Sequence, residues 1–234
     1  MQIARLFRHP VKSVGGQEVD AVDVDARGVV GDRLWAVYTE DGGIGSGKNS
    51  TRFRKVDGLL HWASEATDTG VPVLVAPDGR SFPADSADAT AALADAFGRD
   101  LAPRRERDVP HFDDSALHVV TTASLRAVAA QAGGEVDVRR LRANVLVDTG
   151  DAEGWLEDDW LGRELVLGDE VDGVVLRVTE PMPRCVMVDA SHRDVEGGPK
   201  ILKALGRVHD VELGVQAEVV RPGRLTVGAA VTLR

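Results

Sequence analysis

The feature that most constrains the fold of this chain is a series of short apolar segments separated by turn residues. Along most of these segments hydrophobic and polar residues alternate, which is the period of a strand with one buried face. Glycine, proline and aspartate stand between them and favour tight turns. We therefore predict a mostly β (α+β), barrel-like architecture with strands at residues 3–7, 19–24, 34–38, 71–76, 145–147, 165–167, 174–178, 215–220 and 225–233.

The pattern also predicts a few short helices, each followed by glycine. These are residues 85–97, 124–131 and 199–205, of which the last begins with proline. The charged segment 99–114 has two prolines and no clear period, so it is our candidate for a domain boundary. We predict an N-terminal β-rich region over residues 1–110 and a second domain over residues 111–234.

Composition excludes several classes of protein. A net charge of −10 argues against a nucleic-acid partner. One cysteine excludes an internal disulfide framework and an iron–sulfur cluster held by this chain alone. The first residues lack the apolar core of a signal peptide, and no stretch approaches the roughly 20 apolar residues of a membrane span. We expect a cytoplasmic protein that does not bind membranes.

The glycine-rich segment 42–48 nearly spells a phosphate-binding P-loop. Asn49 stands where that motif needs a hydroxyl, and the residues that follow are polar and β-branched rather than helix-forming. We therefore interpret the segment as a loop whose Lys48 can still reach an anionic ligand.

The single cysteine, Cys185, has an unusual setting. Prolines at 181 and 183 stiffen the backbone ahead of it, and Arg184 places beside it a guanidinium that favours the thiolate. A thiolate can bind a soft metal or act as a nucleophile, whereas the structural alternative is a small buried apolar residue. The apolar residues Val186 and Val188 predict a strand after the cysteine.

Basic residues also stand next to turns or strand ends in four segments, around Lys12, Arg33, Arg142 and Arg184. In an acidic protein, such cations suggest an anionic ligand gathered from distant parts of the chain. The alternative is that each cation pairs with one of the 38 carboxylates. We expect Trp35 and Trp160 to be core residues, and most histidines to be surface or packing residues, with His9 able to reach the cation site.

In combination and order, these segments resemble the MOSC family, named for the C-terminal domain of molybdenum cofactor sulfurases, and in particular its amidoxime-reducing members. The segments that carry the resemblance are Pro10-Val-Lys12-Ser13, Gly28-Val-Val-Gly-Asp-Arg33-Leu-Trp35, Val119-Val-Thr-Thr-Ala-Ser124-Leu125, Val138-Arg-Arg-Leu-Arg142-Ala-Asn144-Val145, Pro183-Arg184-Cys185-Val-Met-Val-Asp189 and Pro222-Gly-Arg-Leu-Thr-Val-Gly228. Between about residues 42 and 110 the resemblance is weak.

The resemblance implies a MOSC-type β-barrel that holds a molybdenum cofactor of the molybdopterin type. The first ~35 residues would contribute to the cofactor site, and Cys185 would be the protein ligand of the metal. The residues implied to surround the pterin and its phosphate are Lys12, Ser13, Arg33, Arg142, Asn144 and Arg184, with Ser115 and Ser124 at further cofactor positions. Asp189 is a candidate catalytic proton donor or orienting group near the metal, or else a turn carboxylate. Asp114 departs from the family pattern, which has a small hydroxyl residue there.

The activity implied is that of an oxidoreductase that reduces N-hydroxylated substrates such as amidoximes, hydroxamates or hydroxylamine-like bases. No second cofactor motif is present, so its electrons would come from a separate reductase or small electron carrier. A first alternative is a sulfur carrier with a persulfide on Cys185, supplied by a partner desulfurase because no pyridoxal-phosphate lysine motif is present. A second is a barrel that binds another anionic ligand without chemistry.

Overall fold

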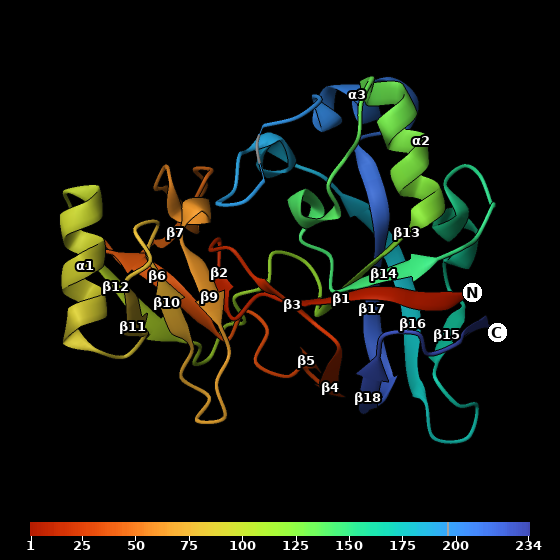
Figure 1. Cartoon of the computed structure of the whole chain (residues 1–234), viewed down its shortest axis with the longest axis horizontal. Helices are drawn as coiled ribbons and strands as arrows, with labels where there is room; N and C mark the ends of the chain where they lie inside the picture. The colour runs from red at the N-terminus through yellow and green to blue at the C-terminus, as the bar shows by residue number, and fades with distance from the viewer. Residues whose placement is uncertain (196) are drawn as a thin grey trace.

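The computed structural model describes residues 1–195 and 197–234, which form two lobes joined by the N-terminal strands (Figure 1). The C-terminal lobe contains a sheet with the order β19-β15-β16-β17-β13-β14-β1-β3. Its strands are β19 (Val231–Leu233), β15 (Glu164–Leu167), β16 (Val174–Pro183), β17 (Glu212–Arg221), β13 (Leu117–Thr121), β14 (Val145–Asp148), β1 (Gln2–Arg8) and β3 (Gln17–Val19). A smaller sheet below it joins β18 (Gly223–Thr226), β4 (Ala21–Asp25) and β5 (Gly28–Val29).

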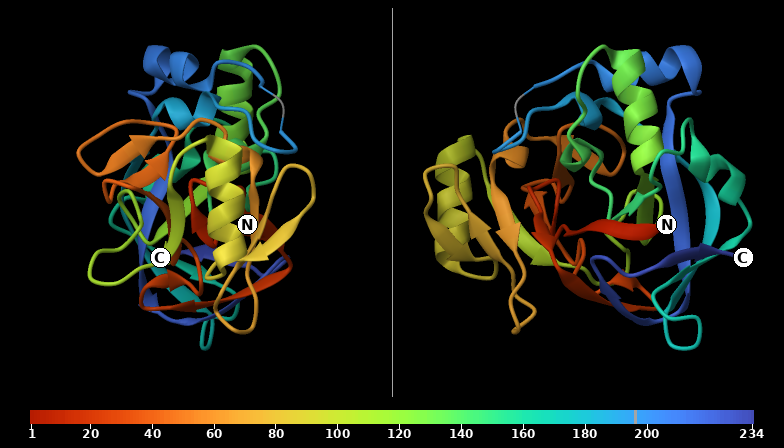
Figure 2. Two further views of the ribbon diagram at one scale, coloured as in Figure 1. Left: turned by 90° about the vertical axis from the view of Figure 1, so that its left-hand side faces the viewer. Right: turned by 45° about the vertical axis from the view of Figure 1, so that its right-hand side comes forward.

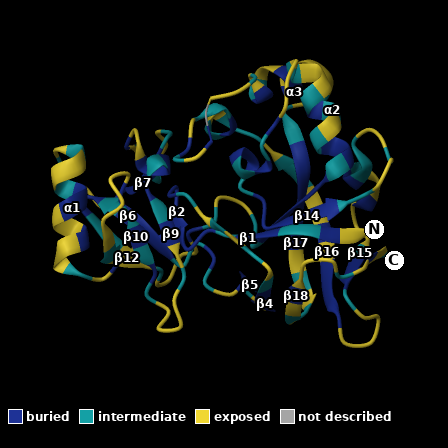
Figure 3. Ribbon diagram, in the orientation of Figure 1, coloured by how far each residue is buried: buried dark blue, intermediate teal, exposed yellow. Residues whose placement is uncertain are grey.

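The N-terminal lobe contains two further sheets. One has the order β12-β6-β7-β8, with β2 beside β6, and the other has the order β11-β10-β9. Their strands are β2 (Val11–Lys12), β6 (Trp35–Thr39), β7 (Ile44–Ser46), β8 (Phe53–Lys55), β9 (Ala63–Glu65), β10 (Val73–Val75), β11 (Ser81–Pro83) and β12 (Leu101–Arg105). The protein is therefore mostly β, as the alternating pattern predicts, and its strands are the most buried parts of both lobes (Figure 3).

Helices cover the outer sides of the sheets. Helix α1 (Ala87–Phe97) flanks the N-terminal lobe, whereas α2 (Thr122–Ala132) and α3 (Ile201–Val208) lie side by side over the large sheet (Figure 2). Helix α2 begins where the Thr121 hydroxyl accepts a hydrogen bond from the Ser124 N–H and ends at Gly133, whose φ is 77°. Short 3₁₀ turns are η1 (Leu59–His61), η2 (Val138–Leu141), η3 (Leu156–Trp160) and η4 (Val186–Asp189).

Each lobe has its own apolar core. The N-terminal core packs Trp35, Leu59 and Leu93 together, and the core of the large sheet contains Trp160 and Leu117. Both tryptophans are buried, as predicted. Burial of one large apolar side chain stabilises the folded state by roughly 1.5–3 kcal/mol, because it removes apolar surface from water. The two cores therefore stabilise the two lobes.

The chain passes from one lobe to the other within its first 40 residues. Strand β1 pairs with β14 in the large sheet, and the next strand, β2, pairs with β6 in the N-terminal lobe. Strands β3 and β4 then return, and β4 pairs with β18. Strands from both sides of residues 110 and 111 share the large sheet. The domain boundary predicted at this point stays a prediction.

Four local predictions differ from the structure. Residues 19–24 do not form one strand, because β3 ends at Val19 and β4 begins at Ala21 in a different sheet. Residues 225–233 do not form one strand, because Gly228 (φ 83°) lies between β18 and β19. Helix α3 continues past Gly206 to Val208. Val186 and Val188 lie in the 3₁₀ turn η4 rather than in a strand. In a strand the two side chains would lie on the same face, but Val188 is buried and Val186 is exposed.

No helix of the described residues is long and apolar enough to cross a membrane.

Candidate functional site

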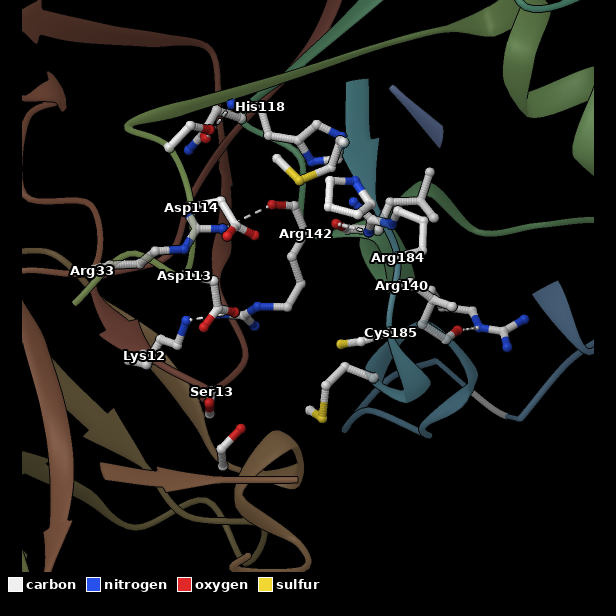
Figure 4. Close-up of a pocket in the computed structure, with 18 residues that line it drawn as sticks. Lys12, Ser13, Arg33, Asp113, Asp114, His118, Arg140, Arg142, Arg184 and Cys185 are labelled. Carbon is white, nitrogen blue, oxygen red and sulfur yellow. Dashed lines mark hydrogen bonds and ion pairs between the residues drawn. The ribbon is translucent and has the colours of Figure 1, made fainter. Parts of the chain in front are cut away.

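A cavity of about 110 Å³ lies where the two lobes face one another (Figure 4). Its walls contain cationic, hydroxyl, amide and sulfur-bearing side chains from both lobes. The residues predicted from the sequence that line it are Lys12, Ser13, Arg33, Ser115, Arg142, Asn144, Arg184 and Cys185. Residues more than 170 positions apart in the chain therefore meet at one place.

Three of these residues have a backbone conformation that is unusual for them. The φ angles of Ser13, Arg33 and Arg142 are 61°, 49° and 54°, in the left-handed region that L-residues avoid at a cost of roughly 1–2 kcal/mol. Ser13 directly follows β2, Arg33 stands two residues before β6, and Arg142 ends η2. Backbone strain gathered at one cavity is typical of a functional site.

Lys12 brings a buried charge into the cavity from β2. Burial lowers the pKa of its ammonium group to about 8, and the nearby carboxylate of Asp113 opposes that shift. The Lys12 Nζ lies 2.9 Å from an Asp113 oxygen, and the Lys48 Nζ lies 3.7 Å from the same oxygen. Asp113 thus partly neutralises the cations on this side.

Arg33 makes two contacts through its side chain and one through its backbone N–H, which donates to the His9 oxygen at 2.7 Å. Its Nη1 pairs with the fully buried carboxylate of Asp32, and its Nη2 donates to the backbone oxygen of Arg142 at 2.9 Å. The other Asp32 oxygen accepts the backbone N–H of His9 at 2.6 Å. These bonds join the segments before β2, before β6 and after η2.

Arg142 and Arg184 keep part of their hydrogen-bonding capacity unused. Arg142 donates from Nη1 to the Val14 oxygen at 2.7 Å, and Arg184 donates from Nη2 to the Leu141 oxygen at 2.5 Å. The Arg142 Nη2 and the Arg184 Nε are buried and have no partner within the described residues. Burial lowers the pKa of both guanidinium groups, and for Arg142 the charge of Arg33 lowers it further. A hydrogen-bond acceptor that enters the cavity would satisfy the unpaired donors and would oppose the lowering of both pKa values.

Asn144 connects the strands under the cavity. Its Oδ1 accepts the backbone N–H of His118 at 3.2 Å, and its Nδ2 donates to the Phe7 oxygen at 3.4 Å. The hydrogen bonds of its side chain therefore mainly connect β1, β13 and β14. Asn144 also lines the cavity, where it fixes the position of these strands. Ser115 also faces the cavity, but its hydroxyl donates to the Leu117 oxygen at 3.0 Å.

Cys185 is half-buried and stands at the start of η4, immediately after β16. Strand β16 pairs with β17 up to Pro183, with register shifts that bend the strand. Past Val178 it no longer pairs with β15, so Pro181 and Pro183 remove no bond on that edge. In Figure 4 the Cys185 sulfur points toward the side of the cavity that carries Lys12 and Ser13.

Two predicted residues lie outside this cavity. The Ser124 hydroxyl donates to the buried Glu157 carboxylate at 2.5 Å, at the start of α2, so Ser124 does not face the cations. Asp189 accepts Arg140 Nη2 at 3.3 Å and the Ile201 N–H at 2.8 Å. It therefore fastens η4 to α3, and its side chain lines a neighbouring cleft instead.

His9 lies close to the site without lining this cavity, whereas the glycine-rich segment contributes Ser46 to its wall. His9 is buried, with its Nε2 at 3.3 Å from the Ala143 oxygen, and burial keeps the pKa of its imidazole well below the usual value. The glycine-rich segment contains β7 and leads into β8 rather than a helix, which is the context predicted against a P-loop.

The sequence analysis missed several residues of the wall: Asp113, His118, Arg140 and Met187. Asp113 directly precedes Asp114, the acidic residue that departs from the family pattern, and both border the cavity. Arg140 lies within the basic segment already identified, with its Nε donating to the Val188 oxygen at 2.9 Å. His118 and Met187 carry no signal in a single sequence, because each occupies an ordinary position in an apolar segment.

A second, wider cleft of about 520 Å³ adjoins the cavity. Ser13 and Met187 line both spaces. The walls of the cleft come from the segment after β8, from η1 and from η4. In the described residues, no group of three or more histidine, cysteine or carboxylate side chains is placed to hold a metal ion. Cys185 is the one thiol among the described residues that line this cationic cavity, beside the thioethers of Met182 and Met187.

The comparisons with known proteins agree with this architecture. Residues 94–232 match the MOSC domain, and residues 1–112 match the MOSC N-terminal beta barrel domain. The crystal structure of the YuaD protein from Bacillus subtilis covers 99% of this chain and 94% of its own, with 16% identity and a TM-score of 0.54, which indicates a shared fold. That of YiiM from Geobacillus stearothermophilus covers 52% of this chain and 55% of its own, with 20% identity and a TM-score of 0.37.

No curated protein matches the sequence. The family matches together span both lobes, and they include every segment on which the resemblance rests. With a mostly β fold and a cavity that gathers the predicted cations around one cysteine, the expectation drawn from those segments is confirmed: this chain belongs to the MOSC family, with a MOSC N-terminal β-barrel domain preceding its MOSC domain.

Proposed function

We propose that this protein binds a molybdenum cofactor of the molybdopterin type between its lobes and reduces N-hydroxylated compounds. The observation that carries the proposal is the meeting of Cys185 with Lys12, Arg33, Arg142 and Arg184 around one cavity. A pterin phosphate is anionic, and a dithiolene-bound metal accepts a soft sulfur ligand, so this set of donors suits both ends of such a group.

The residues present fit the cofactor by a test that is independent of the family. The buried Arg142 Nη2 and Arg184 Nε lack partners, and a buried donor without an acceptor costs about 1–3 kcal/mol. An anionic, acceptor-rich ligand removes that cost. The inner cavity of about 110 Å³ is smaller than typical ligand pockets, so the cofactor would extend beyond it toward open space between the lobes.

Each residue would then have a defined task. Cys185 would provide the protein ligand, while Lys12, Ser13 and Arg33 would hold the anionic end from the N-terminal lobe. Arg142 and Arg184 would contact the group from the C-terminal lobe, and Asn144 would position the wall between them. Asp189 would keep the turn that carries Cys185 in place through its bonds to Arg140 and Ile201.

When bound, the cofactor would supply a centre that exchanges two electrons, as needed to cleave an N–O bond. The balance of the reaction is one N–OH group, two electrons and two protons converted into one N–H group and water. We infer that the electrons come from a separate reductase or small electron carrier, since the sequence shows no second cofactor motif.

The experiment that tests the proposal compares the wild-type protein with Cys185→Ala, both made in a molybdenum-replete host. We expect molybdenum and pterin in the wild type, reduction of benzamidoxime with a chemical electron donor, and loss of that reduction in Cys185→Ala with an unchanged fold. Retained reduction in the variant would refute the ligand assignment. A protein without molybdenum whose Cys185 carries the mass of one extra sulfur atom would instead support the sulfur-carrier alternative.

A further inference from the structure

Met187 and Ser13 border both the cavity around Cys185 and the wider cleft outside it. Met187 lies in η4, two residues after Cys185, and lines both spaces. It is half-buried, and methionine can change its shape through three rotatable bonds. A residue at this position decides how large a molecule can pass from the cleft to the sulfur of Cys185.

Met187 rests against the other lobe at Gly47, which directly follows β7. A Cβ atom at position 47 would overlap the Met187 sulfur and would lie 2.9 Å from its terminal methyl carbon. A side chain at position 47 and the present position of Met187 are therefore incompatible. This contact explains the glycine at position 47 without phosphate binding.

The outer cleft differs in charge from the inner cavity. The inner cavity is lined by five cationic side chains and two carboxylates among the described residues. In the cleft, Lys55 pairs with Asp57 at 3.0 Å, and Asp189 pairs at 3.3 Å with Arg140 of the inner cavity, so the cleft has no unpaired cation among these residues. The rest of its wall includes apolar residues, among them Val56, Leu59, Leu60 and Ala190. An anion is favoured inside, and an uncharged apolar group is favoured in the cleft.

We propose that the outer cleft binds the apolar body of the substrate and that Met187, resting against Gly47, is the steric gate through which the reactive group reaches Cys185. The substrate part rests on the proposed function, with the N-hydroxylated group directed inward and the apolar body left outside. The gate part does not rest on it, because it concerns access to a thiol that the chain itself contains.

Access to the thiol can be measured without the cofactor, since Cys185 is the one cysteine in the sequence. The full-length chain, made in a host that lacks the cofactor, is labelled with N-ethylmaleimide and with the much larger fluorescein maleimide. The ratio of the two rates reports the width of the access route, because any change in the intrinsic reactivity of the thiol affects both reagents.

We expect Met187→Ala to raise the ratio of large-reagent to small-reagent rates by about tenfold, and Met187→Leu, which conserves volume, to change it by less than about twofold. Gly47→Ala should raise the ratio by displacing Met187, and it should have no further effect in the Met187→Ala background. Gly47 is not in the left-handed region, so alanine is tolerated there by the backbone. An unchanged ratio in both folded single variants would overturn the gate.

The substrate part is tested on the molybdenum-loaded protein with a small aliphatic and a bulky aromatic amidoxime. Met187→Ala should lower KM for the bulky compound relative to the small one by about fivefold. Reduction of both compounds with an unchanged preference would overturn the assignment of the cleft. Absence of any reduction by the wild type would refute the proposed function instead, and the labelling ratios would still decide whether Met187 is a gate.

Discussion

Lys12 and Asp113 form an ion pair of 2.9 Å that links strand β2 to the segment between β12 and β13. The ammonium group is buried, whereas the carboxylate is partly exposed to solvent. Asp113 therefore occupies one side of the cationic cavity with a negative charge of the protein itself. A bound anion has to compete with that charge or to share Lys12 with it.

The first prediction concerns this competition. Asp113→Asn removes the carboxylate, so we expect the affinity for pyrophosphate, used as a probe anion, to rise about three- to tenfold at pH 7. Titration calorimetry on the cofactor-free chain measures it. Asp78→Asn serves as the control, because Asp78 is exposed and paired with Arg80 far from the cavity in sequence and fold. A loss of affinity in Asp113→Asn would show that Asp113 supports the site.

The second prediction concerns pH. Burial lowers the pKa of Lys12 to about 8, so Lys12 loses its proton near pH 8 in the free protein, whereas a bound anion favours the charged form. Pyrophosphate affinity should therefore fall as the pH rises through 8. Lys12→Arg should bind without this decrease, and Lys12→Gln should bind weakly at every pH. A wild-type affinity that is level from pH 7 to 9.5 would contradict the assignment.

The same shift has a consequence for stability. Because the pKa of Lys12 is lower in the folded protein than in the unfolded chain, the unfolded chain binds more protons between about pH 8 and 10.5. The contribution of Lys12 to the free energy of unfolding therefore rises over that window. Lys12→Gln should lose this rise, which denaturant titrations at pH 7.5 and 10 can measure.

The third prediction uses the left-handed conformation of Arg142. Arg142→Ala and Arg142→Gly remove the same guanidinium contacts, but alanine remains strained at φ 54° and glycine does not. We expect both variants to contain less molybdenum, and Arg142→Gly to be more stable to unfolding than Arg142→Ala by about 1 kcal/mol. Molybdenum content equal to wild type in both would contradict the proposed role of Arg142.

The fourth prediction concerns Glu157, the partner of Ser124. Burial raises the pKa of its carboxyl group, against the opposing hydrogen bonds from Ser124 and Thr121. The ionised form is therefore unfavourable in the folded protein, and stability is lost as the pH rises through the folded pKa. Glu157→Gln should stabilise the protein by about 1 kcal/mol at pH 8 and have little effect at pH 4. A stabilisation that does not change with pH would contradict this explanation.

Local patterns predicted the three helices and most of the longer strands, but not short strands such as β2, β5, β7 and β8. The alternation at β4 and the capping residues of α2 act within a few residues, and the sequence shows them directly. Pairing across the fold is different. The exchange of β1, β2 and β4 between the lobes depends on contacts with β14, β6 and β18, which no local period reveals.

The candidate site shows the same limit. The cations around Lys12, Arg33, Arg142 and Arg184 could be found from the family resemblance and the sequence together, and they do line one cavity. Ser124 matched a family segment equally well, but its hydroxyl bonds to Glu157, a partner 33 residues away. Asp113 and Met187 became visible only in three dimensions, because their roles come from Lys12 and Gly47 on other elements.

The pairing of β4 with β18 joins Asp23 to Arg224 across nearly the whole chain. Contacts between such distant residues form slowly, because a long loop must close before they yield any stabilisation. The cavity cannot take shape during synthesis of the first lobe alone, since most of its lining residues, from Asp113 to Val188, come later in the chain. Insertion of the proposed cofactor would thus have to follow synthesis of the C-terminal lobe.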